Sequence, residues 1–358
     1  MPSWTDEPAT PYLVVDVSRL EANLAAMSAH ARHRGLALRP HVKTHKCPVI
    51  ARRQLDRGAV GLTVATVSEA EAFAAAGFTD LFVAYPLWVT PGQGHRISAL
   101  LDRAALTVGV DSPEGAQALA AQVVGHERLL VLVEVDSGHH RSGVSPDDAG
   151  SVAAAARDAG LDVAGVFTFP GHGYRPGSQS SVGHLEAEAL GTAAALLVAR
   201  DIEPRVVSGG STPTADHVPK GAMNELRPGV YVFGDAQQWE LGTIGPEDLA
   251  LTCRATVVST AGGRIVVDSG SKVLGADRLD WATGYGRLLH HPDARVTLLS
   301  EHHAVVSWDD TPLPSAGDRV DVVPNHVCTA VNLADVLHVK QDGALVDRWP
   351  VAARGANS

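Results

Sequence analysis

Lys43 is the strongest candidate for a nucleophile in this chain. It belongs to the segment Arg39-Pro-His-Val-Lys-Thr-His-Lys, at the end of an apolar run that we predict to be a β-strand. A lysine that faces an enclosed cavity is partly dehydrated, which lowers the pKa of its ammonium group and lets the amine attack a carbonyl carbon to form a Schiff base. The alternative is a solvated lysine in a loop, which is the more common situation.

A second segment has the composition of an anion site. In Val207-Ser-Gly-Gly-Ser-Thr-Pro-Thr, glycines let backbone N–H groups approach an anion closely, and Ser208, Ser211 and Thr212 add hydroxyl donors. Turns also need glycine for local reasons, so the segment alone is weak evidence. Arg141 follows another apolar run and could either hydrogen-bond an anionic cofactor or form a surface ion pair. A reactive lysine together with an anion site points to a phosphorylated aldehyde as cofactor.

Two further polar residues follow another expected strand, in Phe169-Pro-Gly-His-Gly-Tyr. His172 and Tyr174 would face the same end of the sheet as Lys43, where either could act as an acid, a base or a donor to phosphate. Packing within a tight Gly/Pro turn explains both residues equally well, and the sequence leaves the two interpretations open.

A possible metal site lies near the end of the chain, in Pro324-Asn-His-Val-Cys-Thr. If this segment is an extended strand, His326 and Cys328 point to the same face and can bind one ion together. Imidazole and thiolate favour Zn²⁺ over Mg²⁺ or Ca²⁺, and two protein ligands would leave positions open for water or substrate. The alternative is a buried cysteine beside an unrelated histidine.

The elements that must position these residues alternate regularly along the first two thirds of the chain. Short apolar runs are separated by alanine-rich stretches with a helical pattern, which indicates parallel βαβ units and a closed (β/α)8 barrel of the TIM type. An open, doubly wound sheet is the alternative, but no G-x-G-x-x-G follows the first run. The expected strands are 36–43, 60–66, 80–85, 106–110, 129–136, 163–169, 205–211 and 226–233, and the clearest helices are 67–76, 113–124, 146–159 and 182–200.

We expect two domains, with the barrel over residues 1–241 and a smaller β-rich domain over 242–358. Ahead of the barrel, residues 18–34 are predicted to form a helix that begins with Ser18 as N-cap and Glu21 completing a capping box. After residue 242 the helical pattern fades into short β-branched runs separated by Gly, Pro and Asp.

Composition narrows the choice of partners. The 358 residues carry a net charge of −11 and no block of lysine and arginine, which argues against nucleic-acid and anionic-membrane partners. The longest apolar runs are too short to cross a bilayer, and the first residues lack the pattern of a signal peptide. Three widely spaced cysteines fit a reducing compartment, so we expect a cytoplasmic protein.

Several of these motifs, in this order, resemble the D-threonine aldolase / D-serine dehydratase family of alanine-racemase-type enzymes that use pyridoxal 5′-phosphate (PLP). The resemblance covers about residues 9–340. It is carried by Arg39-Pro-His-Val-Lys-Thr-His-Lys, Thr63-Val-Ala-Thr-Val-Ser-Glu-Ala-Glu, Ser208-Gly-Gly-Ser-Thr, Arg227-Pro-Gly-Val-Tyr and Pro324-Asn-His-Val-Cys-Thr.

The resemblance implies roles for individual residues. Lys43 matches the lysine that binds PLP, Arg141 the arginine at the PLP 3′-oxygen, and Arg227 an arginine that faces the pyridine nitrogen. The residues that match the family's phosphate site and its neighbouring tyrosine are Gly210, Ser211, Gly229, Val230, Tyr231 and Tyr174, with Ser208 and Thr212 beside them. His326 and Cys328 match a metal-binding pair, implying a divalent ion such as Zn²⁺ or Mn²⁺.

The implied activity is that of a lyase acting on β-hydroxy D-amino acids, in a homodimer. Lys43 and His172 are the expected catalytic residues. Aldol cleavage of D-threonine to glycine and acetaldehyde is the first expectation, and dehydration of D-serine or D-threonine to a 2-oxo acid and ammonia is the alternative. An amino-acid racemase and a non-catalytic PLP-binding protein fit less well, because neither accounts for the His/Cys pair in a second domain.

Overall fold

The computed structural model describes residues 7–308 and 312–358, and within them the chain forms two units. One unit comprises residues 27–43, 51–229 and 356–358, and contains a sheet of eight parallel strands. The other comprises the residues up to 26 together with 44–50 and 230–355, and is rich in antiparallel strands. Each unit is described by itself below.

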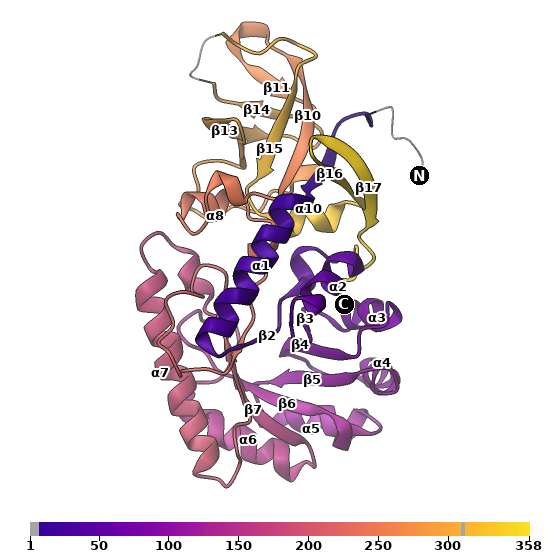
Figure 1. The fold of residues 1–358 in the computed structure, drawn as a ribbon. Coiled ribbons are helices and arrows are strands. Elements are labelled where there is room, and N and C mark those ends of the chain that lie inside the picture. Colours follow the sequence, from indigo (N-terminus) through magenta and orange to yellow (C-terminus); the bar gives the residue numbers. More distant parts are fainter. Residues whose placement is uncertain (1–6, 309–311) are drawn as a thin grey trace. The chain divides into compact units, whose positions relative to one another are not determined.

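The eight parallel strands confirm the expected (β/α)8 architecture. Their order is β2-β9-β8-β7-β6-β5-β4-β3, and a parallel bridge between His41 and Thr63 joins the two ends of this series. Helices α3 to α7 lie around the outside of the strands (Figure 1). The strands are β2 (Ala37–Leu38), β3 (Leu62–Val64), β4 (Asp80–Pro86), β5 (Ala105–Val110), β6 (Leu130–Glu134), β7 (Asp162–Phe167), β8 (Val206–Gly209) and β9 (Glu225–Leu226).

Aromatic side chains fill part of the barrel interior. Phe82 and Phe167 meet edge to face with ring centroids 5.0 Å apart, and Leu132 and Ala164 pack against them. Gly109 leaves room for this arrangement, since a Cβ at that position would lie 2.7 Å from the ring of Phe167. Parallel strands covered on both faces need such continuous apolar sequence, which is why their runs stand out in the amino-acid sequence.

Polar residues at the strand ends set where the barrel helices begin. Thr66, Thr90 and Ser112 each accept a hydrogen bond from the backbone N–H of the third residue of the following helix, which satisfies a donor that has no partner within the helix. The helices are α2 (Pro48–Asp56), α3 (Val67–Ala75), α4 (Pro91–Leu101), α5 (Pro113–Gln122), α6 (Ala149–Asp158) and α7 (Gln179–Val198).

The expected N-cap of the first helix was wrong. Helix α1 (Val17–Arg34) is capped by Asp16, whose Oδ1 accepts the N–H groups of Ser18 at 3.1 Å and Arg19 at 3.2 Å. Asp16 ends the preceding strand, so its extended backbone and short carboxylate satisfy the free amides before Ser18 can do so.

The β-rich unit contains a closed ring of six strands. These are β10 (Leu251–Ser259), β11 (Ile265–Val267), β14 (Ala304–Val306), β13 (His291–Leu299), β12 (Gly286–Leu288) and β15 (Arg319–Pro324), and β11 pairs back to β10. β1 (Tyr12–Asp16), β16 (Val336–Gln341) and β17 (Ala344–Pro350) extend this sheet beyond β10. The same unit contains two short helices, α8 (Ala236–Glu240) and α10 (Val327–Leu333).

The N-terminal strand belongs to this second unit. β1 pairs antiparallel with β10 and parallel with β16, and the unit resumes at residue 230, ahead of the boundary we expected at 241/242. Among the described residues, no helix has both the length and the apolar character needed to cross a bilayer.

Candidate active site

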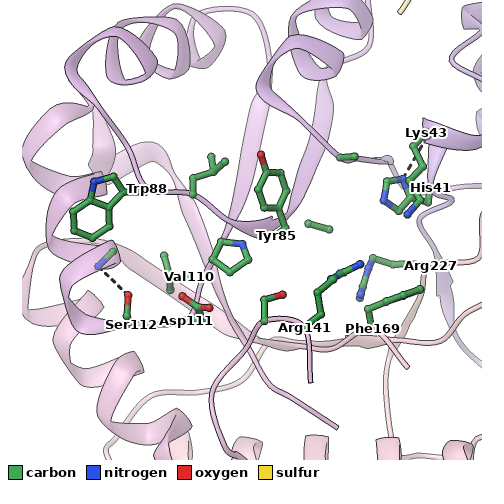
Figure 2. Close-up of a pocket in the computed structure, with 16 residues that line it drawn as sticks. His41, Lys43, Tyr85, Trp88, Val110, Asp111, Ser112, Arg141, Phe169 and Arg227 are labelled. Carbon is green, nitrogen blue, oxygen red and sulfur yellow. Dashed lines mark hydrogen bonds between the residues drawn. The ribbon is translucent and has the colours of Figure 1, made fainter. Parts of the chain in front are cut away.

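A cavity of about 560 Å³ opens in the barrel unit at the C-terminal ends of the strands. Lys43, Arg141, Phe169 and Arg227 lie together along one part of its wall (Figure 2). These residues follow four different strands, so the barrel brings together side chains that are far apart in the sequence. Active sites of (β/α)8 barrels lie at this same face.

Two cations in the cavity converge on one aromatic ring. The Nζ of Lys43 lies 5.6 Å from the ring centre of Phe169, and the Cζ of Arg141 lies 5.1 Å from it. Within residues 7–308 and 312–358, neither the ammonium group nor the guanidinium group has a hydrogen-bond or ion-pair partner. Two such positive groups in a cavity fit an anionic ligand, and the primary amine among them fits an aldehyde.

The third cation of the cavity, Arg227, is fixed by the protein itself. Its guanidinium group donates to the Oγ of Ser208 and, at 2.6 Å, to the carbonyl oxygen of Thr168. The Ser208 hydroxyl donates in turn to Glu225 at 2.6 Å, and Arg39 holds the other oxygen of Glu225 at 2.7 Å. Burial lowers the pKa of Arg227, while the nearby carboxylates act in the opposite direction. This hydrogen-bond network holds the guanidinium group of Arg227 in one orientation at the wall of the cavity.

A buried glutamate, Glu186, accepts a hydrogen bond from the loop that we predicted to bind phosphate. The N–H of Gly210 donates to Glu186 at 2.5 Å, and the N–H of Ser211 donates to the hydroxyl of Thr214 at 3.0 Å. These two amides, which we expected to bind an anion, therefore already have partners. Glu186 is fully buried on α7, and burial raises the pKa of its carboxyl group to about 7.

Sequence reasoning missed Glu186, although a signal was present. It lies four residues after Val182 and four before Leu190, and both of these are buried on the same helix. A glutamate at helical spacing between two core positions must be buried, and a buried carboxyl group needs a specific reason to be there.

His172, Tyr174, Val230 and Tyr231 do not line the cavity. His172 stacks on His139 with ring centroids 6.5 Å apart, and both of its ring nitrogens are buried without a hydrogen-bond partner among the described residues. Burial lowers the pKa of His172. The ring of Tyr174 lies 6.2 Å from that of Phe169, while Val230 and Tyr231 begin a short 3-10 turn in the other unit, directly after Gly229.

The His/Cys pair lies at the start of a helix, and not on a strand as we predicted. His326 directly precedes α10, and Cys328 is the second residue of that helix, so the alternation of a strand does not bring them together. The pair is nevertheless close. The pKa of His326 rises well above its usual value because Cys328 and Asp235 outweigh the opposing effect of burial, and one contribution is a hydrogen bond between the His326 and Cys328 side chains.

A buried carboxylate orients the histidine. The Nδ1 of His326 lies 3.1 Å from the Oδ2 of Asp235, whose side chain is fully buried. With Nδ1 bound to a carboxylate, Nε2 is the nitrogen left for a metal ion, as in many zinc sites. The thiol of Cys328 lies 3.4 Å from the hydroxyl of Thr44, the residue that follows Lys43 in the chain. Nothing in the sequence marked Asp235 as a partner for a residue 91 positions away.

This donor set suits zinc but is incomplete as a closed metal site. An imidazole and a thiolate are preferred ligands of Zn²⁺, and a carboxylate behind the imidazole is the usual support. The described part of the chain holds no cluster of three or more His, Cys, Asp or Glu residues able to hold a metal ion. A metal on His326 and Cys328 would therefore keep positions open for water or substrate, as catalytic zinc does.

Comparison with known proteins identifies the family. Residues 15–237 match the model of the alanine racemase N-terminal domain, and residues 250–340 match that of a serine dehydratase domain. The chain is 36% identical to a D-threonine aldolase of Arthrobacter sp., over 97% of this chain and 93% of that one. It is 35% identical to the D-threo-3-hydroxyaspartate dehydratase of Delftia sp. (strain HT23), over 89% and 90% of the two chains.

Solved structures support the same family assignment. The D-threonine aldolase from Filomicrobium marinum has a TM-score of 0.88 and 32% identity, covering 97% of this chain and 96% of that chain. Variants of the hydroxyaspartate dehydratase, with a TM-score of 0.87 and 32% identity, cover 96% of this chain. One is substituted at a histidine, the other at a cysteine two positions later, and the cysteine variant is described as metal-free. The chain belongs to the D-threonine aldolase / D-serine dehydratase family of PLP-dependent lyases, which confirms the resemblance.

Proposed function

We propose that this protein binds PLP through Lys43 and cleaves β-hydroxy D-amino acids with the help of a divalent metal ion. The observation that carries the proposal is the convergence of Lys43 and Arg141 on Phe169, where neither cation has a hydrogen-bond or ion-pair partner in the described parts of the chain. When bound, PLP supplies an electron sink for the charge released at the substrate Cα.

The barrel residues have distinct roles in this proposal. Lys43 provides the amine that binds the cofactor aldehyde and afterwards, as a free amine, accepts the proton from the substrate Cα at Nζ. Arg141 binds the 3′-oxygen of the cofactor, and Arg227 faces its ring nitrogen in the orientation set by Ser208 and Thr168. The residues proposed at the phosphate are Ser208, Gly210, Ser211, Thr212, Gly229, Val230 and Tyr231, with Tyr174 as their neighbour. To bind it, the N–H groups of Gly210 and Ser211 would have to leave Glu186 and Thr214. His172 is the second candidate base, since burial lowers the pKa of its imidazole and so favours the neutral form.

His326 and Cys328 hold the metal ion in this proposal, with Asp235 fixing the imidazole. A divalent ion there supplies Lewis-acid assistance to the β-hydroxyl or carboxylate of the substrate. Zn²⁺ suits the imidazole and thiolate donors better than Mn²⁺, which prefers oxygen ligands.

Dehydration is one of the two reactions that the sequence leaves open, and we infer that the His/Cys pair would assist it. His326 and Cys328 have the same order and spacing as the histidine and cysteine substituted in the dehydratase variants, of which the cysteine variant is metal-free. A metal held by His326 and Cys328 would supply Lewis-acid assistance to the departure of the β-hydroxyl, and Lys43 would accept the Cα proton at Nζ. D-Threonine would then give 2-oxobutanoate and ammonia.

Aldol cleavage remains the second candidate, because the D-threonine aldolase of Arthrobacter sp. is as similar to this chain as the dehydratase is. A base would remove the β-hydroxyl proton of D-threonine, the Cα–Cβ bond would break, and glycine and acetaldehyde would result.

Product analysis tests the proposal directly. The purified holoenzyme is incubated with D-threonine and with D-serine, and 2-oxo acids, ammonia, glycine and aldehydes are quantified. 2-Oxobutanoate or pyruvate with stoichiometric ammonia supports dehydration, and glycine with acetaldehyde supports aldol cleavage. Formation of nothing but the L-enantiomer, or full activity after treatment with a chelator, would refute a metal-assisted lyase.

We also propose that the protein works as a homodimer in the cytoplasm. The dimer is an inference from the family, and the three cysteines, all free of disulfides, support a reducing compartment. Light scattering of the active enzyme tests the assembly, and a monomer mass at full activity would contradict it.

A further inference from the structure

The charged residues of the cavity are unevenly distributed. Lys43, Arg141 and Arg227 lie toward one end, and Trp88 and Asp111 lie at the other (Figure 2). We call this other part the distal half, lined by Tyr85, Leu87, Trp88, Val110, Asp111 and Ser112. Among these lining residues Asp111 alone carries a charge, and it is negative.

Two barrel loops hold the distal half in place. β4 ends at Pro86, and Leu87 and Val89 anchor the following loop because both side chains are buried. Trp88 lies between them and is 68% exposed, so its ring is available at the edge of the cavity. An apolar group laid against this indole would remove apolar surface of both from water, and an aromatic group would gain ring–ring contact as well.

Asp111 gives the distal half a negative charge. It lies between the end of β5 at Val110 and Ser112, which caps α5, so the strand end and the capped helix hold it on both sides. Its Oδ2 accepts the N–H of Gly143 at 3.3 Å, and its charge contributes to the raised pKa of Glu134, after the larger effect of burial. A second carboxylate placed beside Asp111 would meet a like charge, which disfavours it.

We propose that the distal half is the subsite for the β-substituent of the substrate, and that Trp88 and Asp111 make it selective for large, uncharged, preferably aromatic groups. The inference rests on the proposed lyase function and names its substrate class. The site accepts D-3-phenylserine and rejects D-3-hydroxyaspartate, even though a relative of 35% identity is named for the latter substrate.

The test compares kcat/KM for D-threonine, D-3-phenylserine and D-3-hydroxyaspartate in the holoenzyme. We expect phenylserine to exceed hydroxyaspartate by at least about 100-fold, since a like-charge contact and a lost aromatic contact both act against the latter. Asp111→Asn should raise kcat/KM for hydroxyaspartate by about tenfold, because it removes a single like charge. Trp88→Ala should lower the ratio of phenylserine to threonine kcat/KM by about tenfold, through KM more than kcat.

Matched controls separate these effects from general ones. Asp147→Asn removes an exposed carboxylate outside the cavity, and Val124→Ala truncates a side chain that is 77% exposed, so neither should change any substrate ratio. A wild-type preference for hydroxyaspartate, or substrate ratios unmoved by both Asp111→Asn and Trp88→Ala, would overturn the inference while leaving the lyase proposal intact. Failure to convert any of the three substrates would instead refute the lyase proposal.

Discussion

Replacing Glu186 with glutamine should change how the stability of the protein depends on pH. Glu186 is fully buried, one of its oxygens accepts the Gly210 N–H at 2.5 Å, and Oε2 has no partner among the described residues. Burial raises the pKa of the carboxyl group from 4.5 to about 7, because the cost of dehydrating a carboxylate outweighs the opposing effects of the Gly210 N–H and of the Arg227 charge.

The sign of the effect follows from the direction of this shift. An acid whose pKa is higher in the folded state than in the unfolded state gives its full stabilisation below pH 4.5 and loses it as the pH rises toward 7. At about 1.4 kcal/mol for each pKa unit, the loss amounts to about 3 kcal/mol by pH 8. Glutamine cannot ionise, so Glu186→Gln should lack this loss and gain stability relative to the wild type as the pH increases.

Urea unfolding at several pH values between 5 and 8.5 measures the difference in unfolding free energy between the two proteins. A fixed cost of placing an amide in the pocket shifts this difference by the same amount at every pH, so the slope is the diagnostic quantity. Glu188→Gln, an exposed substitution on the same helix, is the matched control and should give a flat difference. A flat difference for Glu186→Gln as well would refute the reasoning.

Further predictions concern the cofactor, the metal and the segment that follows Lys43. Lys43→Ala should abolish the visible absorbance of bound PLP. In the wild type, borohydride reduction should attach PLP covalently to Lys43 rather than to Lys46, whose buried ammonium group donates to Asn332 at 2.7 Å. Cys328→Ala should release zinc and leave PLP absorbance unchanged, and Asp235→Asn should weaken zinc binding by about 10- to 100-fold in competition with a chromophoric chelator. Asn332→Leu should lower the unfolding free energy by about 2 kcal/mol in urea titrations, because a buried ammonium group loses an acceptor, and an unchanged urea midpoint would contradict this.

The barrel could be predicted because its signal is repeated. Each parallel strand is buried on both faces and so appears as an apolar run, and each helix between two runs is rich in alanine. The runs at 80–85 and 106–110 match β4 and β5 within a residue or two. Lys43, Arg141 and Arg227 could be placed at one cavity for the same reason, since a barrel gathers its strand ends whatever lies between them.

Two kinds of feature could not be predicted in this way. One is which of two neighbouring residues caps a helix, and the other is which residues far apart in the sequence are in contact. Ser18 and Asp16 are both good N-caps, and only the point at which β1 ends decides in favour of Asp16. For His326 and Cys328 the expected strand was wrong. The β-branched residues of β15 end at Pro324, and α10 begins at Val327, so the pair lies where the strand has given way to a helix. Asp235 approaches His326 from far away in the sequence, and no spacing rule covers such a contact.

The three cations that line the cavity differ in whether their hydrogen-bonding groups are already engaged by the protein. The guanidinium group of Arg227 is committed to Ser208 and Thr168, so it offers a ligand a fixed position and little freedom. Arg141 and Lys43 both face the ring of Phe169, and among the described residues this contact leaves their hydrogen-bonding groups available for a ligand. A buried arginine that is hydrogen-bonded to the protein suits a cofactor that stays in place, whereas an amine that binds the aldehyde and then moves a proton must be able to change partners. The difference in hydrogen bonding between Arg227 and Lys43 is therefore the difference expected between a group that holds the cofactor and a group that reacts.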